Sequence, residues 1–315
     1  MNVSYDLKGY LFYRDNSDIP VLYESHGVNI GKYLQGEFLL TIVDEDKIVT
    51  VSDFGGTRSS DIMPRNTTIV TDINTGKILN YFPNLNTTKT YYIPPQGVIG
   101  KEQYDDFFEA LDVSILNSIQ KTKELYVFLS GGHDSGSITS ALINSGADFK
   151  VLSVVGNEPI EVLKQRWDFL ETNGIEVIKV GADGPLGQDS YQEYKTQYED
   201  DGLGTNYREV CSHYLACKHL PENVTLLSGL GADELYVSGD DELLNQFMRS
   251  TKKVYDHFNV DIRYPLLDYN LYVEFFSLVR NLRRRWKQPF EKYMEQIRFP
   301  YNKEGKIGFY VFDDY

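Results

Sequence analysis

Hydrophobic residues in the last two thirds of the chain form short continuous runs, which alternate with segments where they recur every three or four positions. Continuous apolar runs are typical of buried strands, and the wider spacing is typical of helices with one apolar face. The runs predict strands at residues 125–129, 149–155, 175–180 and 223–227. The spaced segments predict helices at residues 104–118, from Asp134 to Gly146, and from Asn157 to Gly174. This alternation favours an α/β fold with a parallel doubly wound sheet covered on both faces.

The first hundred residues follow a different pattern, because clusters of Asp, Asn and Gly separate their short apolar runs. These runs predict strands at residues 9–13, 38–43, 47–51, 77–81 and 90–93. No long helical period precedes residue 101. We therefore expect a small β-rich domain at residues 1–97, ending at Pro94-Pro95-Gln96-Gly97, and an α/β domain at residues 98–315.

The strand predicted at residues 125–129 runs into Ser130-Gly131-Gly132-His133-Asp134-Ser135, which opens the next helix. The first N–H groups of a helix have no partner within the helix, and the helix dipole adds partial positive charge there. Such a turn is suited to bind phosphate. Its two glycines let the backbone approach phosphate oxygens, and its two serines offer hydroxyl donors. Asp134 is a candidate ligand for Mg²⁺, which neutralises a polyphosphate.

This motif is not a Walker loop, because no Gly-Lys-Ser/Thr follows it. It resembles the SGGxDS loop of the ATP pyrophosphatases. Ser228-Gly229-Leu230-Gly231-Ala232-Asp233-Glu234 is similar to the SGxGxDE element of the asparagine synthetase family. Two later segments, residues 261–268 and 303–309, are similar to the R-x-P-F-L-D and K-x-G-F segments of that family. The chain thus resembles the asparagine synthetase and β-lactam synthetase family from about Gly97 to Phe309.

The resemblance implies an ATP pyrophosphatase domain of the adenine nucleotide alpha hydrolase type, which cuts ATP between the α and β phosphates. It implies that the loop at residues 130–135 grips pyrophosphate. Gly229 and Gly231 would permit close approach of a second loop. Asp134 and Asp233, from neighbouring strand ends, would hold one Mg²⁺.

Two further site segments come from the same resemblance. The backbone of Val154-Val155-Gly156 is expected to meet adenine. Lys306 is expected to stabilise charge at the α-phosphate as the tetrahedral state forms, and Lys303 is the alternative if the register differs.

Part of the first domain, with Gly36-Glu37-Phe38 followed by Ser52-Asp53-Phe54-Gly55, is similar to the glutaminase domain of asparagine synthetases. That domain uses a cysteine directly after the initiator methionine. Here the position holds Asn2, and an amide side chain is not a nucleophile. We expect a shortened, degenerate Ntn-type remnant that packs against the second domain and has no hydrolytic activity.

Two positions of the motifs depart from the family pattern. Leu230 stands where asparagine synthetases have a glutamate and β-lactam synthetases a tyrosine. Leucine cannot deprotonate an attacking amine, so the chain uses a different amine, a base elsewhere, or no second step. His133 takes the variable position of the first loop, and we expect it at the surface or at the rim of the pocket.

Charge and cysteine usage narrow the class of protein. Asp and Glu outnumber Lys and Arg by 46 to 31, for a net charge of −15, which argues against nucleic acid as the main partner. Cys211 and Cys217 form no disulfide framework. No apolar run is long enough to span a bilayer, and no signal-peptide pattern opens the chain. We expect a cytoplasmic protein without a membrane partner.

Two other clusters carry possible chemistry. Cys211, His213, Cys217 and His219 resemble zinc ligands, but on one helix only His213 and Cys217 would share a face, so we disfavour a zinc site. The basic run at residues 280–287 predicts an amphipathic helix with a solvated face, from which Lys287 could reach phosphate or an acidic substrate.

These features favour an ATP-dependent, AMP-forming ligase that adenylates a small carboxylate and then transfers ammonia or an amine to give an amide. ATP and Mg²⁺ are the expected cofactors. The nitrogen would come from free ammonia, a separate ammonia source, or an amine on the substrate, and a homo-oligomer is compatible with the sequence. The alternatives are a catalytically impaired nucleotide-binding homologue with a regulatory or structural role, and an ATP pyrophosphatase that modifies a nucleic-acid base.

Overall fold

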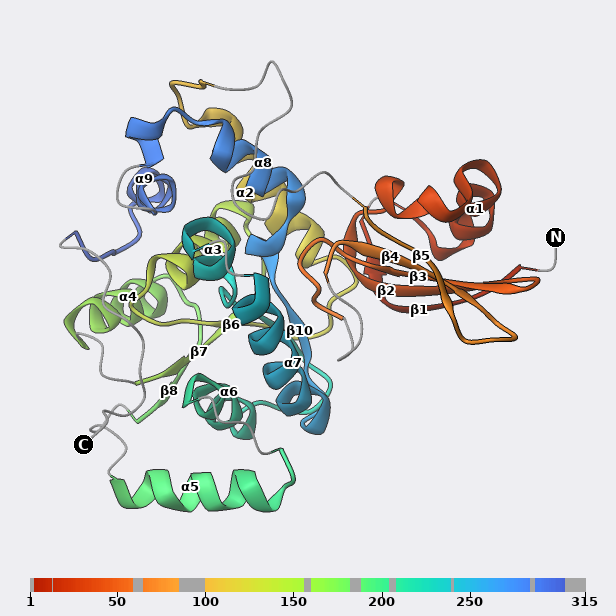
Figure 1. Ribbon diagram of the computed structural model, residues 1–315. Coiled ribbons are helices and arrows are strands. Elements are labelled where there is room, and N and C mark those ends of the chain that lie inside the picture. Colours follow the sequence, from red (N-terminus) through yellow and green to blue (C-terminus); the bar gives the residue numbers. More distant parts are fainter. Residues whose placement is uncertain are drawn as a thin grey trace.

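The computed structural model describes residues 3–12, 14–58, 65–84, 100–155, 160–181, 188–203, 208–238, 241–283 and 287–303. It is a mixed α/β structure with one antiparallel and one parallel sheet, each of five strands (Figure 1). Each sheet belongs to its own cluster of buried hydrophobic side chains. The boundary predicted at residue 97 lies outside the described residues.

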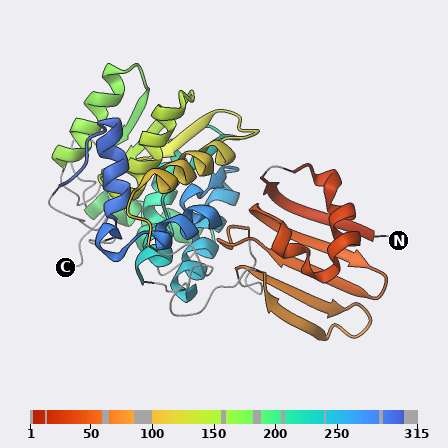
Figure 2. The same ribbon diagram turned by 90° about the horizontal axis from the view of Figure 1, so that it is seen from above.

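The first sheet has the strand order β1-β2-β3-β4-β5. Its strands are Val3–Leu11, Gly36–Asp44, Lys47–Ser52, Thr67–Asp72 and Ile78–Pro83. Alternate residues of a strand point to opposite faces, and Phe38, Leu40 and Ile42 of β2 are buried on one face. Helix α1 (Ile19–His26) and the 3-10 segment η2 (Gly27–Tyr33) contribute to the same hydrophobic cluster, and Figure 2 shows α1 lying across this sheet.

The predicted β-rich character of this region is confirmed, but two elements were missed. Helix α1 has only eight residues, which is too short for a clear helical period, although Pro20 at its start is a helix-opening signal. Strand β4 (Thr67–Asp72) is rich in threonine, so its apolar run is short. Strand β1 also begins earlier than predicted, at Val3. The strand predicted at residues 90–93 lies outside the described residues.

The second sheet has the strand order β10-β9-β6-β7-β8, and every neighbouring pair is parallel. In chain order its strands are β6 Leu125–Phe128, β7 Lys150–Val154, β8 Val177–Val180, β9 Thr225–Leu227 and β10 Asp261–Arg263. The predicted parallel sheet is therefore confirmed, with the four expected strands present and β10 added at one edge.

The helices of this region cover both faces of the parallel sheet, as predicted, with α3 and α4 on one face and α6 and α7 on the other (Figure 1). Their bounds are α2 Asp105–Ser118, α3 His133–Ser145, α4 Ile160–Thr172, α5 Gln188–Asp200, α6 Arg208–Lys218, α7 Asp241–His257, α8 Tyr269–Ser277 and α9 Gln288–Ile297. The short segments η3 Glu234–Ser238, η4 Pro265–Leu267 and η5 Arg280–Arg283 lie between them, and η1 Asn16–Asp18 precedes α1 in the first region. None of the described helices combines the length and the apolar character that a membrane crossing needs.

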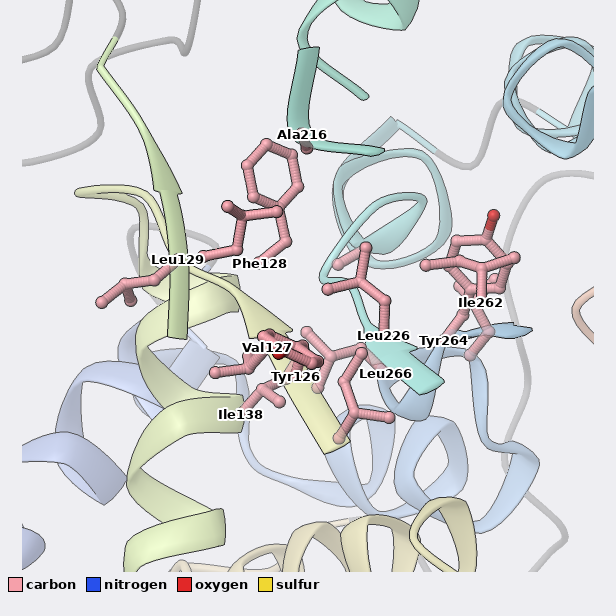
Figure 3. Close-up of a cluster of buried hydrophobic side chains, with 14 of the residues drawn as sticks. Tyr126, Val127, Phe128, Leu129, Ile138, Ala216, Leu226, Ile262, Tyr264 and Leu266 are labelled. Carbon is pink, nitrogen blue, oxygen red and sulfur yellow. The ribbon is translucent and has the colours of Figure 1, made fainter. Parts of the chain in front are cut away.

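The core of the parallel sheet forms because its central strands are apolar on both sides. Val127 of β6 and Leu226 of β9 are fully buried, and Figure 3 shows them beside Ile138 from α3 and Leu266 from the segment after β10. A parallel strand with helices on both faces must bury every side chain, which explains the continuous apolar runs in the sequence.

The helix predicted over residues 280–287 is wrong. Residues Arg280–Arg283 form a 3-10 turn, residues 284–286 lie outside the described ranges, and helix α9 begins only at Gln288. Pro289 accounts for the start of α9, because proline is tolerated in the first turn of a helix but would break a helix that continued through it. Lys287 is the residue before the helix, and its side chain is buried. Its predicted reach toward phosphate or an acidic substrate stays a prediction.

The two sheets meet through a buried polar junction around Glu37 of β2. Its Oε1 accepts hydrogen bonds from the backbone N–H of Tyr264 (2.8 Å) and from the hydroxyl of Tyr10 (3.0 Å). Nearby, Arg58 donates to Asp261 Oδ1 (2.8 Å) of β10. Loss of solvent raises the pKa of Glu37 to about 7, and the positive charge of Arg58 offsets only part of that rise. The expected packing of the first domain against the second is therefore present at this junction.

Glu37 predicts a specific pH dependence of stability. A glutamate that is raised from its ordinary value to about 7 binds a proton more tightly in the folded chain than in the unfolded chain. Its contribution to the free energy of unfolding is therefore complete at low pH and is lost as the pH rises through about 7. We expect the unfolding free energy of wild type to fall by about 2–3 kcal/mol relative to that of Glu37→Gln between pH 5 and pH 8, measured by urea titration. A difference that is the same at both pH values would contradict this assignment.

Candidate functional site

The two glycine-rich motifs lie at the same edge of the parallel sheet. One follows β6 and the other follows β9, and these strands are neighbours, with Val127 paired to Leu227. The strand order reverses here, because β7 and β8 extend the sheet on one side of β6 while β9 and β10 extend it on the other. In open α/β sheets, such a switch point at the carboxyl ends of strands is where ligands bind.

The first loop is organised by hydrogen bonds within the loop. The N–H of Ser130 donates to Ser135 Oγ (3.1 Å), the two hydroxyl groups are 3.0 Å apart, and the N–H of Gly132 donates to Ser130 Oγ (3.2 Å). Gly132 caps helix α3 in an extended conformation, and the helix ends at Gly146 with a left-handed residue, as predicted. The hydroxyls proposed as phosphate donors thus hold the loop in shape.

The second motif packs directly against the first. A Cβ at Gly229 would lie 2.7 Å from the Cβ of Asp134 and 3.1 Å from the backbone nitrogen of Ser135, so only glycine allows this approach. Gly231 has a left-handed backbone, with φ of 86°, which also favours glycine. The motif continues into the π-helical turn η3, a form that is common at functional sites.

A lysine outside both motifs joins their carboxylates. Lys287 Nζ forms an ion pair with Asp134 Oδ2 and a second one with Asp233 Oδ1 at 2.6 Å. Lys287 is only 4% exposed. Burial alone lowers the pKa of Lys287, but the charges and hydrogen bonds of the two aspartates more than offset this and raise the pKa above its usual value. The buried ammonium is therefore charged.

The aspartate pair is suited to a divalent cation, because both carboxylates already converge on a single positive charge. Carboxylate oxygens are the ligands that Mg²⁺ prefers, and sites that also bind phosphate often use only one or two carboxylates. Within the described ranges, no group of three or more His, Cys, Asp or Glu side chains converges as a metal site. Asp134 and Asp233 are the residues of this site that could hold Mg²⁺.

His133 is buried, and the expectation of a surface or pocket-rim position is wrong. Its Nε2 is 3.2 Å from the carbonyl oxygen of Asn302 and 3.7 Å from Glu291 Oε1. Burial lowers the pKa of His133, an effect that the carbonyl contact and the charge of Glu291 partly oppose. The side chain ties the first loop to residues 299–303, the segment after α9.

Arg166 was missed at the level of sequence. It lies on α4 between Leu163 and Leu170, on the apolar face of that helix, and its side chain donates to carbonyl oxygens of the first loop. The signal was available, because a single charged residue within a helix's apolar stripe has to be satisfied by a buried partner.

The remaining predicted residues have mixed positions. Val154 and Val155 are buried at the end of β7, next to β6, and the N–H of Val155 donates to the carbonyl of Val180 (2.9 Å). Leu230 is partly buried against the core. Gly156 and Lys306 lie outside the described residues, so their roles stay predictions.

Two members of the Cys/His cluster, His213 and Cys217 of helix α6, are part of the core, whereas His219 is exposed after the end of the helix. His213 is buried, contacts the hydroxyl of Tyr255 through Nδ1, and packs edge-on against Phe128. Burial lowers the pKa of His213 to about 4, and burial raises the pKa of the Cys217 thiol. A neutral imidazole and a protonated thiol in this setting serve packing.

The chain has only weak similarity to known proteins. No protein-family model and no curated protein matches the chain. Among solved structures, an NMN synthetase from Francisella tularensis has a TM-score of 0.31 and 12% identity, over 63% of this chain and 97% of its own. A glutamine-dependent NAD+ synthetase from Acinetobacter baumannii, in complex with ADP, has a TM-score of 0.32 and 9% identity, over 83% of this chain and 52% of its own. Similarity at this level does not establish a common fold.

The ion pairs of Lys287 predict that removing this lysine lowers the stability of the fold, and Lys150 provides a control. Lys287→Ala would leave two neighbouring carboxylates without their cation, at a cost of about 2 kcal/mol in urea unfolding, because the pair is only partly buried. Lys150 also bridges two carboxylates, Glu124 and Glu176, but on the surface, so Lys150→Ala should cost less than about 1 kcal/mol.

Lys287→Ala also tests whether Asp134 and Asp233 bind a metal ion. With the ammonium removed, millimolar Mg²⁺ should stabilise Lys287→Ala more than wild type, because a ligand that binds only the folded state raises its stability. Equal responses of the two proteins to Mg²⁺ would count against a metal site at Asp134 and Asp233.

Proposed function

We propose that this chain is an ATP-dependent ligase of the ATP pyrophosphatase type, which adenylates a small carboxylate, releases pyrophosphate, and passes the acyl group to ammonia or an amine. The supporting observation is the convergence at one switch point of a helix-opening glycine loop, two carboxylates and a buried lysine. Helix N-terminal N–H groups and a lysine bind phosphate, and paired carboxylates suit the Mg²⁺ that accompanies it.

In this proposal, the loop at residues 130–135 holds the β and γ phosphates through its N–H groups. Lys287 is already charged, and it would pair with the polyphosphate if Asp134 and Asp233 held Mg²⁺. Mg²⁺, held by Asp134 and Asp233, would neutralise phosphate charge. Lys306 is proposed to stabilise the developing charge at the α-phosphate.

The nitrogen donor is proposed to be ammonia or an amine brought from outside. Asn2 provides no nucleophile for glutamine hydrolysis, and the glutaminase-like residues Glu37 and Asp53 are used in structure. Glu37 anchors the junction with Tyr264, and Asp53 accepts the N–H of Phe38 (2.7 Å). We propose that the first sheet is a degenerate glutaminase-like module, beside a domain of the adenine nucleotide alpha hydrolase type, in a cytoplasmic enzyme.

Release of pyrophosphate tests the proposal. Wild type with Mg²⁺, ATP, ammonium and a panel of small carboxylic acids should yield pyrophosphate and AMP with at least one acid, and glutamine should not replace ammonium. Asp134→Ala should lower the rate by at least about a hundredfold, the size of effect seen when charge stabilisation is removed from an active site. Asp168→Ala is the control, because Asp168 is an exposed residue of α4. Formation of ADP and inorganic phosphate instead would overturn the proposal.

A second candidate is a nucleotide-binding protein without catalysis, with a regulatory or structural role. Leu230 favours it, because leucine offers no base beside the phosphate loop. The ion pairs of Lys287 favour it as well, since they already give Asp134 Oδ2 and Asp233 Oδ1 a positive partner without a metal. Calorimetric titration with ATP, followed by a search for AMP in the same sample, separates the two functions. ATP binding with no AMP formed in the presence of any of the carboxylic acids would support this second function.

A further inference from the structure

Arg166 is a buried cation directly behind the phosphate loop. It is fully buried on α4, and its Nη1 donates to the carbonyl oxygens of Ser130 and Gly132, the latter at 2.9 Å. Its Nε donates to the carbonyl of Pro300 (2.9 Å), and its guanidinium carbon lies 5.3 Å from the ring centre of Phe299. One side chain thus holds both the loop and the segment that follows α9.

Helix α3 leaves room for this guanidinium. A Cβ at Gly136, in the first turn of α3, would lie 2.5 Å from Arg166 Nη2 and 2.6 Å from Met294 Sδ of α9. Any larger residue at position 136 would push the arginine away from the loop carbonyls. Gly136 therefore serves the approach of Arg166, in addition to being part of the helix that opens at the loop.

The direction of the loop's peptide groups follows from these contacts. In a trans peptide, the carbonyl of one residue and the N–H of the next point in opposite directions. Because the carbonyls of Ser130 and Gly132 face Arg166, the N–H groups of Gly131 and His133 face the other way, out of the loop on the side away from the guanidinium. The N–H of Gly132, between them, donates within the loop to Ser130 Oγ (3.2 Å), so Gly131 and His133 supply the N–H groups on the outer side of the turn. Backbone N–H groups that share one side of a turn can contact an anion.

We propose that Arg166 is the positioning residue of an anion site formed by this loop, and that it fixes the loop's N–H groups toward a pyrophosphate or polyphosphate ligand. Its buried positive charge lies behind the same loop and attracts the anion with little screening by salt. Through Pro300, and with His133 on Asn302, the same contacts couple the anion to the segment at residues 299–303. This inference rests on the proposed function for the identity of its ligand.

The chain contains a matched control for this arginine. Arg263 is also buried, donates to two backbone carbonyls, Ser118 (2.7 Å) and Gln120 (2.8 Å), and lies over an aromatic ring. It belongs to the junction between the sheets and does not form part of the loop. Arg263 also pairs with Asp261 Oδ2 (2.8 Å), so Arg263→Met measures the cost of removing a buried arginine together with one ion pair.

The experiment compares Arg166→Met, Arg166→Lys and Arg263→Met with wild type by calorimetric titration with pyrophosphate and Mg²⁺. We expect Arg166→Met to bind pyrophosphate at least about tenfold more weakly than Arg263→Met, since charge-assisted hydrogen bonds order the loop. Arg166→Lys keeps the charge but cannot reach three carbonyls at once, so its affinity should lie between those of wild type and Arg166→Met. If Arg166→Met does not fold, the pyrophosphate affinity of Arg166→Lys is compared with that of Arg263→Met instead.

Amide hydrogen exchange of residues 129–136 in the ligand-free proteins gives a second readout that needs no ligand. Exchange in this stretch should be faster in both Arg166 variants than in Arg263→Met. Equal exchange and equal pyrophosphate affinity in the Arg166 and Arg263 variants would overturn the inference and leave the proposed function standing. If wild type binds neither pyrophosphate nor ATP, the proposed function fails, and the exchange rates still decide whether Arg166 orients the loop.

Discussion

The parallel pairing of β6 with β9 is the constraint on which the candidate site depends. Parallel neighbours end at the same edge, so two motifs about a hundred residues apart in the chain are brought together wherever these strands pair. Pairing alone would leave the loops separated by their side chains. The bare backbone of Gly229 removes that separation, and it places Asp134 and Asp233 within reach of one ammonium group, that of Lys287.

The local charge at this edge differs from the charge of the whole protein. The chain carries a net charge of −15, yet the first loop lies between two buried cations, Lys287 and Arg166. Burying a cation is unfavourable unless oxygens surround it, and here carboxylates surround the lysine and backbone carbonyls surround the arginine. Net charge alone therefore says little about whether a small anion can bind; the few groups near the loop decide that.

Sequence patterns predict the parallel sheet well, because its strands are continuous apolar runs and its helices have recognisable ends, such as Gly146 after α3. The same patterns correctly place the two glycine motifs at one edge of that sheet. They fail where tertiary contacts decide the outcome. The basic run predicts a helix over residues 280–287, but Arg280–Arg283 form a 3-10 turn and α9 begins only at Gln288. The ion pairs of Lys287 with Asp134 and Asp233 depend on residues far away in the sequence. The buried position of His133 is not predictable from its neighbours, because its partner, the carbonyl of Asn302, is distant in sequence.

The polar junction at Glu37 has a consequence for how this protein can be divided. Its carboxylate accepts an N–H from the backbone next to β10, and Arg58 neutralises Asp261 of that strand. In a fragment that began after the first sheet, the amide of Tyr264 would lose its acceptor, and Asp261 of β10, the strand next to β9, would keep only Arg263 as a cationic partner among the described residues. The amino-terminal sheet thus stabilises edge strand β10 of the second sheet, and this structural role does not depend on any catalytic activity of the first domain.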